Sequence, residues 1–355
     1  MDFQKYIDLL RELIITPSFS GEENGTADIL GRFLSNEGIL FHRVKNNLIA
    51  INHHFDPHKE NILLNSHHDT VKVNAGWTRD PFGAAIEDGN IYGLGSNDAG
   101  GPLISLVAAF VYYYYKKDLP FNIVIAATAE EETFGPNGLS ALLGKELPDI
   151  SLGIIGEPTG LSLGVAEKGL LVLDIEYRGK AGHAARDTGV NAIYLALKDI
   201  EWFRNYRFDQ ISEYLGPVTM QVTKIEAGYQ HNVIPDICRL VVDIRINDCF
   251  SNSDILKIVR QNIQGIVTPR SMKWNSRSIS LNHPVVIKAQ NMGIPVFGSP
   301  TLSDQVHCDF PTVKIGPGQS ERSHTPDEYI SVDELKEGIH TVIQLLDGLQ
   351  LHQIH

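Results

Sequence analysis

Three consecutive carboxylates close a short apolar run in the first half of the chain. Glu130, Glu131 and Glu132 follow the apolar residues 121–127, and no Lys or Arg lies within the ten residues before them. Adjacent carboxylates repel one another, and burying a charge is costly unless an opposite charge lies nearby. We expect a metal ion to supply that opposite charge.

Two further apolar runs end in side chains that can bind metal ions. The run "NILLNS" leads into His67, and the run "SLGIIG" leads into Glu157, while the glycine-rich "GLGSND" brings Asp98 to the start of a helix expected over residues 102–117. Binding sites in open α/β sheets form beyond the carboxyl ends of the strands, so these side chains should converge on one cleft. Any one of these carboxylates alone is more often a helix cap or a solvated loop charge.

The spacing of His67 and Asp69 suggests a metal-binding histidine with a carboxylate partner. In an extended chain these two side chains lie on the same side, so Asp69 can accept a hydrogen bond from His67 and fix its tautomer, while His68 points away. Nitrogen and oxygen ligands together suit Zn²⁺, with Co²⁺ or Mn²⁺ as alternatives. The number of carboxylates favours two ions that share a bridging carboxylate.

The pattern of apolar runs predicts an α/β protein with two domains. Short buried strands alternate with helix-like stretches over residues 61–155, which is typical of a doubly wound, mixed α/β sheet covered on both faces. From about Gly164 the strands alternate with period two, and helices are expected over residues 191–205 and 253–263, which indicates a smaller α+β domain. The α/β character returns after Ile279, ending in a helix capped by Ser331. We therefore expect a discontinuous catalytic domain, 1–163 and 279–355, with an inserted domain at 164–278.

Composition narrows the possible partners. The 355 residues carry a formal charge of −13, which argues against nucleic acid or an anionic membrane as a partner. We expect no membrane span and no secretory signal, because residues 1–10 are typical of an amphipathic helix. The three cysteines lack metal-ligand spacing and are interpreted as small apolar fillers in a cytoplasmic protein. Likewise, His42, His53, His54 and His58 are interpreted as surface residues.

Five motifs occur in an order that resembles a known family. "SHHDTV", "DPFGAAIEDGNIYGLGSNDAGG", "TAEEET", "GEPT" and "SHTPDEYI" resemble those of the co-catalytic zinc aminoacylase and carboxypeptidase family, over nearly the whole chain. In length and layout the chain is most similar to the acetylornithine deacetylase and succinyl-diaminopimelate desuccinylase branch. The resemblance implies two Zn²⁺ ions per subunit, replaceable by Co²⁺, in the larger domain.

The resemblance also assigns roles to individual residues. It implies that Asp98 bridges the two ions, that Glu131 is the general base and that Asp69 supports His67. Glu130 stands where relatives usually have Asp and would lie outside the ligand sphere, although a register shifted by one, with Glu130 as the base, stays open. Ala99 follows the bridging residue, where relatives often have an acidic residue or Met and Lys, and the family has a cis peptide at that position. The implied metal ligands are His67, Asp98, Glu132, Glu157 and His324.

The inserted domain carries three further residues that the resemblance makes functional. His183 would reach the active site of the partner subunit in a homodimer, and Asn232 and Arg245 would bind the substrate carboxylate. On pattern alone, His183 is more often structural, and Arg245 could equally be a surface charge. The inserted domain would then act in dimerisation or as a lid.

The resemblance implies hydrolysis of a small-molecule N-acyl amino acid. Glu131 would deprotonate the attacking water and then protonate the leaving amine, while His183 would stabilise the oxyanion. Chain length favours N-acetyl- or N-succinyl-ornithine as the substrate, as in arginine biosynthesis. Alternatives are succinyl-diaminopimelate, a dipeptide or a tripeptide. A catalytically silent metal-binding protein is a rival of another class, which the presence of Glu131 disfavours.

Overall fold

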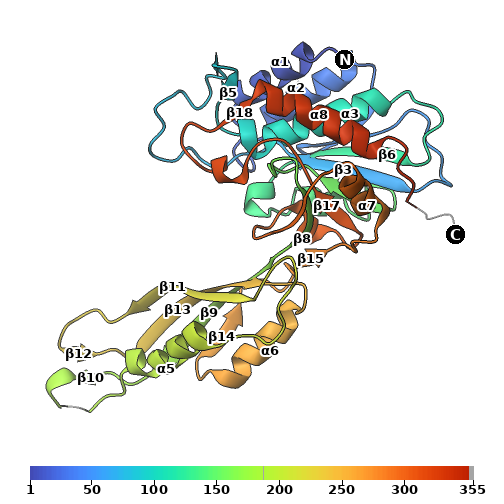
Figure 1. Cartoon of the computed structure of the whole chain (residues 1–355). Coiled ribbons are helices and arrows are strands. Elements are labelled where there is room, and N and C mark those ends of the chain that lie inside the picture. The colour runs from blue at the N-terminus through green and yellow to red at the C-terminus, as the bar shows by residue number, and fades with distance from the viewer. Residues whose placement is uncertain (187, 352–355) are drawn as a thin grey trace. The chain divides into compact units, whose positions relative to one another are not determined.

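The computed structural model describes residues 1–186 and 188–351, which form two compact units. Unit 1 comprises residues 1–165, 279–297 and those from Ser303 onward, and unit 2 comprises residues 166–278 and 298–302. Unit 2 is thus inserted into unit 1 in the sequence. Figure 1 shows the elements of each unit.

Unit 1 contains more strands and helices than unit 2. Its strands are β1 (Phe41–Val44), β2 (Asn47–Ile51), β3 (Asn61–His67), β4 (Ile86–Glu87), β5 (Asn90–Tyr92), β6 (Asn122–Thr128), β7 (Leu152–Ile155), β17 (Thr312–Lys314) and β18 (Tyr329–Ser331). Its α-helices are α1 (Gln4–Ile15), α2 (Asn24–Asn36), α3 (Gly101–Tyr113), α4 (Leu139–Leu142), α7 (Pro284–Asn291) and α8 (Val332–Leu346). Short helical turns are η1 (Ser96–Gly100), η2 (Glu131–Thr133), η4 (Asp304–His307) and η5 (Ser320–Arg322). Strands β8 (Leu163–Glu167), β15 (Arg277–Ser278) and β16 (Val296–Ser299) lie at the unit boundaries in the sequence.

The large sheet is mixed, with a parallel centre. The strand order is β1-β2-β6-β3-β7-β17-β8-β15. Strand β3 pairs in parallel with β6 and β7, and β17 pairs in parallel with β7, whereas β2 pairs antiparallel with β6. Both β3 and β6 are buried along their whole length, as expected for strands covered on both faces. The carboxyl ends of the parallel strands therefore meet at one edge of the sheet.

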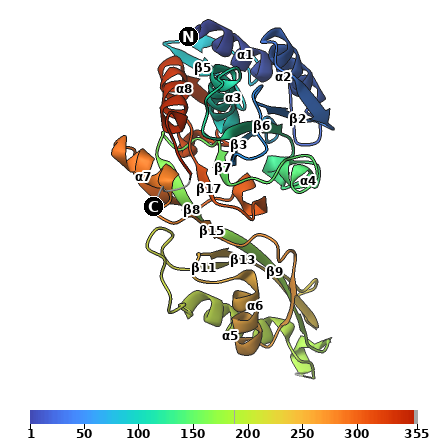
Figure 2. The same cartoon turned by 90° about the vertical axis from the view of Figure 1, so that its right-hand side faces the viewer.

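Helices cover both faces of this sheet. On one face α3 contacts β3, β6 and α8, and Figure 2 shows α1, α3 and α8 in this layer. On the other face, Leu63 and Val124 from the strands pack with Leu139 and Leu142 of α4. Ser331 caps α8 in a reciprocal hydrogen-bond pair with Glu334, which fixes where the closing helix begins. The core of unit 1 thus holds the strand ends in place.

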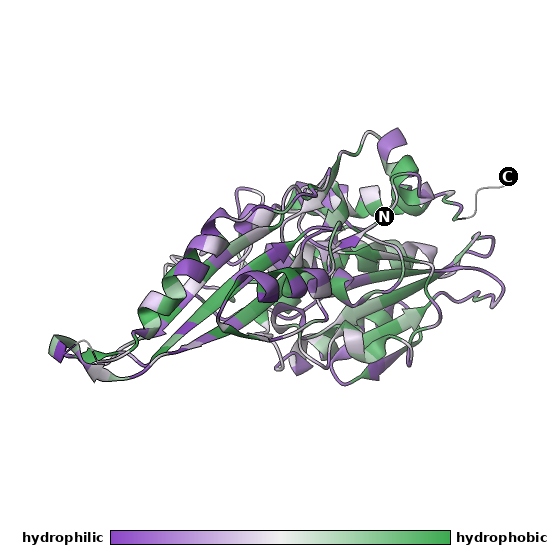
Figure 3. Cartoon of the chain, turned by 90° about the horizontal axis from the view of Figure 1, so that it is seen from below, coloured by the Kyte–Doolittle hydropathy of each residue, from purple (hydrophilic) through white to green (hydrophobic). Residues whose placement is uncertain are grey.

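Unit 2 is a four-stranded antiparallel sheet with helices on one face. Its strand order is β11-β13-β9-β14, and a separate two-stranded sheet pairs β10 with β12. Leu171 and Ile175 of β9 pack with Ala192 and Phe203 of α5 and with Ile255 of α6. Figure 3 shows hydrophobic residues concentrated in the strands and mixed polarity along the helices. The elements are β9 (Gly169–Arg178), β10 (Gly182–His183), η3 (Ala184–Arg186), α5 (Ala192–Asn205), β11 (Thr219–Ala227), β12 (Val233–Ile234), β13 (Ile237–Ile246), α6 (Asn252–Asn262) and β14 (Ile266–Pro269).

The expected fold class is confirmed. The three apolar runs that end in candidate ligands form parallel strands, the helix expected over residues 102–117 spans Gly101–Tyr113, and Ser331 is the N-cap of the closing helix. One expectation is wrong: Cys249 is exposed, so only Cys238 and Cys308 are buried. Cys249 follows the strand β13 in a surface turn and cannot fill a core. Within the described residues, no helix is both long and apolar enough to cross a membrane.

Candidate metal centre

The parallel strands of unit 1 deliver most of the candidate ligands to one edge of the sheet. His67 is the last residue of β3, Glu131 and Glu132 follow β6, and Glu157 follows β7. Two side chains arrive from other segments: Asp98 lies in η1, before α3, and His324 lies between η5 and β18. The sheet explains why residues far apart in sequence lie together here.

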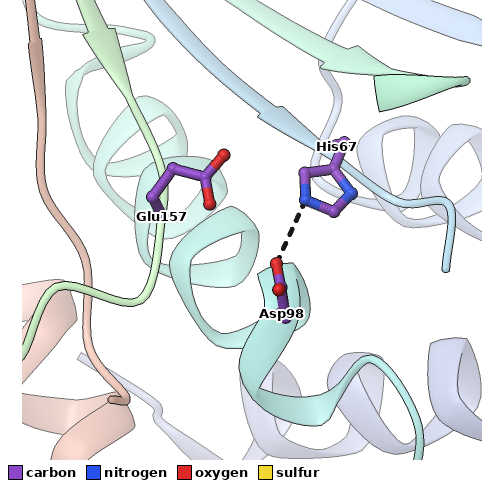
Figure 4. Close-up of side chains that lie close together, drawn as sticks. All are labelled: His67, Asp98 and Glu157. Carbon is purple, nitrogen blue, oxygen red and sulfur yellow. Dashed lines mark ion pairs between the residues drawn. The ribbon is translucent and has the colours of Figure 1, made fainter. Parts of the chain in front are cut away.

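One group of potential metal ligands consists of His67, Asp98 and Glu157. One ligand atom from each lies within 4.8 Å of the others. The His67 Nε2 atom is 3.4 Å from Asp98 Oδ1, and Figure 4 shows the three side chains pointing toward one another. His67 is only 1% exposed, and its Nε2 atom has no hydrogen-bond partner within the described residues. A buried ring nitrogen directed at two carboxylates fits a metal ion of the kind that histidine and carboxylates bind.

A second group consists of Asp98, Glu132 and His324, again with ligand atoms within 4.8 Å of one another. His324 Nε2 is 2.9 Å from Glu132 Oε2 and 3.6 Å from Asp98 Oδ2. Asp98 belongs to both groups, and it presents Oδ1 to His67 and Oδ2 to His324. This is the arrangement that a carboxylate needs in order to bridge two ions.

The electrostatics of these groups show that the cluster needs added positive charge. Burial, with repulsion from Asp98, raises the pKa of Glu157 to about 8. Burial and the charge of Asp98 also raise the pKa of Glu132. Burial alone would lower the pKa of His67, but Asp69 and Asp98 raise it well above its usual value. Cations between these side chains would hold the carboxylates ionised and the imidazoles neutral.

Glu131 lies beside the candidate ligands but in neither group. Its Oε2 atom is 3.8 Å from His67 Nε2, and the side chain is buried. Burial raises its pKa well above the usual value, and the nearby charges of Glu157 and Asp304 act in the same direction. A carboxylate in this position is suited to accept and return a proton.

Glu130 points elsewhere. Its carboxylate accepts hydrogen bonds from the backbone N–H (3.0 Å) and the side-chain amide (2.6 Å) of Asn137. Its backbone has φ 56°, which turns the chain directly after β6 and separates Glu130 from Glu131. The geometry therefore favours the register with Glu131, not Glu130, next to the ligands.

Asp69 supports the site through more contacts than the sequence suggests. The His67 Nδ1 atom lies 3.0 Å from the backbone oxygen of Asp69 and 3.4 Å from its Oδ1 atom, so the main chain is the closer acceptor. The carboxylate accepts from the backbone N–H groups of Glu131 and Glu132 and from the Ser20 hydroxyl. These three donors occupy three of the roughly four lone-pair positions of the carboxylate. Asp69 thus fixes both the His67 ring and the glutamate turn.

His68 faces away from the ligands, as expected. Its ring contacts the Thr26 hydroxyl (2.9 Å) and the backbone oxygen of Asn46 (2.9 Å). Burial lowers its pKa to about 4, so the ring is neutral at pH 7. Of the four histidines expected at the surface, His42, His53 and His58 are exposed and His54 is half-buried.

Sequence reasoning missed several buried residues around the site. Asp304 accepts a hydrogen bond from Thr128 at the end of β6, and burial raises the pKa of Asp304 to about 6. Glu328 accepts from three backbone N–H groups around Asp98. Glu328 lies within the motif "SHTPDEYI", which is the one available signal. No sequence pattern singles out Asp304, because its partner is brought near by the fold.

The three functional candidates of unit 2 do not form one cluster. His183 of β10 is exposed, and it lies near Asn232 because the backbone of Ala184 donates to the Asn232 carbonyl (3.0 Å). Arg245 lies on β13, where it pairs with Asp243 (2.8 Å). The structure therefore brings His183 and Asn232 together within unit 2, whereas Arg245 is held by a neighbour on its own strand. Their roles stay predictions.

An α/β sheet that gathers histidines and carboxylates beyond its parallel strands is typical of two-metal hydrolases. Residues 63–348 match the model of Peptidase family M20/M25/M40, so the chain belongs to this family of hydrolases. The family resemblance expected from the motifs is thereby confirmed.

Individual relatives span nearly the whole chain. Succinyl-diaminopimelate desuccinylase 2 of Ruegeria sp. is 27% identical over 93% of this chain and 91% of its own length. Acetylornithine deacetylase of Yersinia pseudotuberculosis is 29% identical, with 98% of both chains covered. Among solved structures, aminopeptidase PepT from Bacillus cereus matches with a TM-score of 0.78, 21% identity and 98% coverage of both chains. A dinuclear metal-binding M20 peptidase from Bacillus subtilis matches with a TM-score of 0.75, 17% identity and 99% coverage of both chains. The solved structures support the fold.

Proposed function

We propose that the chain is a metal-dependent amidohydrolase that removes an acetyl or succinyl group from an N-acyl amino acid. One observation carries the proposal: Asp98 directs one carboxylate oxygen at His67 and the other at His324, with Glu131 beside them. The ligand set suits two Zn²⁺ ions per subunit, and Co²⁺ can replace them because it accepts the same nitrogen and oxygen donors. When bound, such ions polarise a substrate carbonyl and lower the pKa of water.

The side chains of unit 1 have distinct tasks in this reaction. Glu131 takes the proton of the attacking water on one of its carboxylate oxygens and passes it to the leaving amine nitrogen. The Asp69 carboxylate orients Glu131 by accepting a hydrogen bond from the Glu131 backbone N–H, which limits the motion of the turn after β6. Burial of Glu131 supports this role, because it raises the proton affinity of the carboxylate.

His183, Asn232 and Arg245 complete the proposal from unit 2. We propose a homodimer in which His183 of the partner subunit donates a hydrogen bond to the developing oxyanion. Asn232 and Arg245 would bind the substrate carboxylate, for which Arg245 would have to exchange its contact with Asp243 for the substrate. The exposure of His183 supports this assignment, since a side chain that acts in another subunit must be accessible.

The substrate is N-acyl-L-ornithine in our first proposal, consistent with arginine biosynthesis in the cytoplasm. The relatives named as succinyl-diaminopimelate desuccinylases favour succinyl-diaminopimelate as a second candidate. A succinyl group adds a second carboxylate to the substrate and so needs one more cationic or donor contact than an acetyl group. A small peptide, such as a tripeptide, is the third candidate, because a dinuclear zinc peptidase would use the same metal ligands.

Hydrolysis assays distinguish these candidates. The purified chain, with its metal content measured, is assayed with N-acetylornithine, N-succinylornithine, N-succinyl-diaminopimelate and a tripeptide. The proposal predicts turnover of an N-acyl amino acid that EDTA abolishes and Zn²⁺ or Co²⁺ restores. Faster cleavage of the tripeptide would replace the deacylase assignment by a peptidase. Two bound ions with no turnover of any substrate would favour a silent metal-binding protein.

A further inference from the structure

The turn that carries Asp98 departs from regular helical geometry. Asp98 has φ −116° and ψ 99°, and Ala99 has φ −117° and ψ 37°, so neither continues the helical path into α3. Asn97 is fully buried in this turn. Buried backbone N–H groups need acceptors, and here the main chain of the turn does not supply them all.

The missing acceptors come from Glu328, more than two hundred residues away in the sequence. Its Oε1 atom accepts from the N–H groups of Asn97 (2.8 Å) and Asp98 (2.9 Å), and its Oε2 atom accepts from Gly95 (3.0 Å). The side chain is 2% exposed, and its own backbone oxygen accepts from Gly93 (2.9 Å). One carboxylate thus holds the backbone on the near side of the bridging aspartate.

A second contact joins the segment of Asp98 to the segment of His324. Here a side chain of the Asp98 segment bonds to the main chain of the other segment. The side-chain amide of Asn97 donates to the backbone oxygen of Gln319 (3.0 Å), and its Oδ1 atom accepts from the Gln319 N–H (2.8 Å). A Cβ atom at Gly318 would lie 2.3 Å from Asn97 Oδ1, so only glycine permits this approach. Gln319 and Glu328 lie on either side of His324 in the sequence. The segment of Asp98 and the segment of His324 are therefore fastened to each other twice.

We propose that Glu328 is a positioning residue that fixes the backbone of Asp98 and therefore the position of its bridging carboxylate. Asn97 holds the same two segments together through Gln319, and we call the contacts of Glu328 and Asn97 the brace. Asp98 contributes to both ligand groups, so a displacement of its backbone disturbs both metal positions at once. A carboxylate suits this task because it offers several lone pairs to N–H groups that converge from one turn. The inference rests on the proposed metal-dependent function for its consequence, but the brace itself is a feature of the chain alone.

Glu328→Gln is the variant that tests this proposal, because it keeps the side-chain volume. The amide can retain one acceptor oxygen, but its NH₂ group must face at least one of the three N–H donors. Asp327→Asn is a matched control in the same loop. Asp327 also accepts from backbone N–H groups, those of Thr78 (2.9 Å) and Arg79 (3.0 Å), but none of its partners belongs to the Asp98 turn.

Two measurements on the full chain test the proposal. Amide hydrogen exchange, followed by mass spectrometry with and without Zn²⁺, should accelerate over residues 94–100 in Glu328→Gln and stay unchanged in Asp327→Asn. Titration with Zn²⁺, and with Co²⁺ followed by its visible absorption, should show affinity weakened by about 10–100-fold in Glu328→Gln alone. Activity of Glu328→Gln should recover in part at raised metal concentration.

Unchanged exchange or unchanged metal affinity in Glu328→Gln would overturn the inference. So would an equal loss in Asp327→Asn, because the effect would then belong to the loop as a whole. If Glu328→Gln does not fold, Glu328→Asp takes its place, since the shorter carboxylate cannot reach all three donors. Failure of the unmodified chain to bind Zn²⁺ would refute the proposed function, and the exchange experiment on the metal-free chain would still decide whether the brace exists.

Discussion

Asp69 accepts a hydrogen bond from the backbone N–H of Glu131, with an N–O distance of 3.1 Å. Its second oxygen accepts from the N–H of Glu132 (3.2 Å) and from the Ser20 hydroxyl (2.7 Å). One buried carboxylate therefore fixes the turn that carries both the proposed base and a proposed ligand. The charge of Asp69 acts on the site through these N–H groups as well as through His67.

Asp69→Asn should lower both metal affinity and turnover, because the amide NH₂ group would face N–H donors. The loss of a group that hydrogen bonds to a metal ligand and holds it in place typically costs about 10–100-fold in metal affinity or activity. Zinc titration and kcat/KM measure the two effects. Ser20→Ala, which removes one donor and leaves the carboxylate, should cost less than Asp69→Asn. Equal losses in the two variants would show that the carboxylate has no special role.

Glu131→Gln should abolish turnover while leaving metal binding nearly unchanged. Removing a general base typically costs on the order of a hundredfold or more in rate. Glu130→Gln is the control, because Glu130 has the same side chain one residue away but hydrogen bonds to Asn137. The kcat and the bound zinc are measured for each variant. A Glu130→Gln variant that loses as much activity would favour the shifted register.

The sequence predicts the ligands better than the groups that hold them. His67 and Glu157 could be predicted as candidate ligands because strand ends in a parallel sheet share an edge, and Asp98 because the motifs match a family. Glu328 and Asp304 could not be assigned roles, because each acts through backbone or hydroxyl groups that only the fold brings near. Every residue except proline has a backbone N–H group, so the sequence does not show which residues donate to such a carboxylate.

The contacts of Asp69 show the same limit at short range. The H-x-D spacing places Asp69 on the His67 side of the strand, and the two side chains do lie 3.4 Å apart. The spacing alone does not reveal that the backbone oxygen of Asp69 is the closer acceptor, or that the carboxylate is already engaged by Glu131 and Glu132. Those contacts depend on where β6 ends relative to β3.

Zinc binding to the metal-free chain should release protons at pH 7. Burial and Asp98 raise the pKa of Glu157 to about 8, so this carboxyl is largely protonated at pH 7 and must lose its proton to bind a cation. The contribution of Glu157 to this proton release should decrease as the pH rises above about 8, because the carboxyl group is then already ionised in the metal-free chain. Calorimetry in two buffers of different ionisation enthalpy measures the release. Equal binding heats in both buffers at pH 7 would contradict the prediction, and Glu157→Gln should reduce the release.

His68 should make the fold sensitive to acid. Its folded pKa of about 4 lies below the unfolded value of 6.5, so the unfolded chain binds the proton more readily. Stability from the neutral ring is complete above pH 6.5 and is lost as the pH falls toward 4. The largest effect is about 3 kcal/mol.

Melting temperatures in EDTA test this pH dependence. The difference between the unmodified chain and His68→Gln should widen as the pH rises from 4 to 7, because only the unmodified chain regains a buried neutral imidazole. Acidic groups shared by both chains cancel in the comparison. A constant difference across that range would show that burial of His68 does not contribute to the pH dependence.

Mixed dimers should reveal whether His183 acts across subunits. Neither His183→Ala nor Glu131→Ala alone is expected to turn over substrate at a significant rate, since each lacks a group that the proposed reaction needs. In a dimer of one chain of each kind, one site combines the intact Glu131 of one chain with the intact His183 of the other, so activity should return when the two proteins are mixed and reassociate. Mixing Glu131→Ala with Asp98→Asn is the control. Both changes lie in unit 1, so every site keeps one defect and no recovery is expected. Recovery in neither mixture, with mixed dimers shown to form, would place the action of His183 within its own chain.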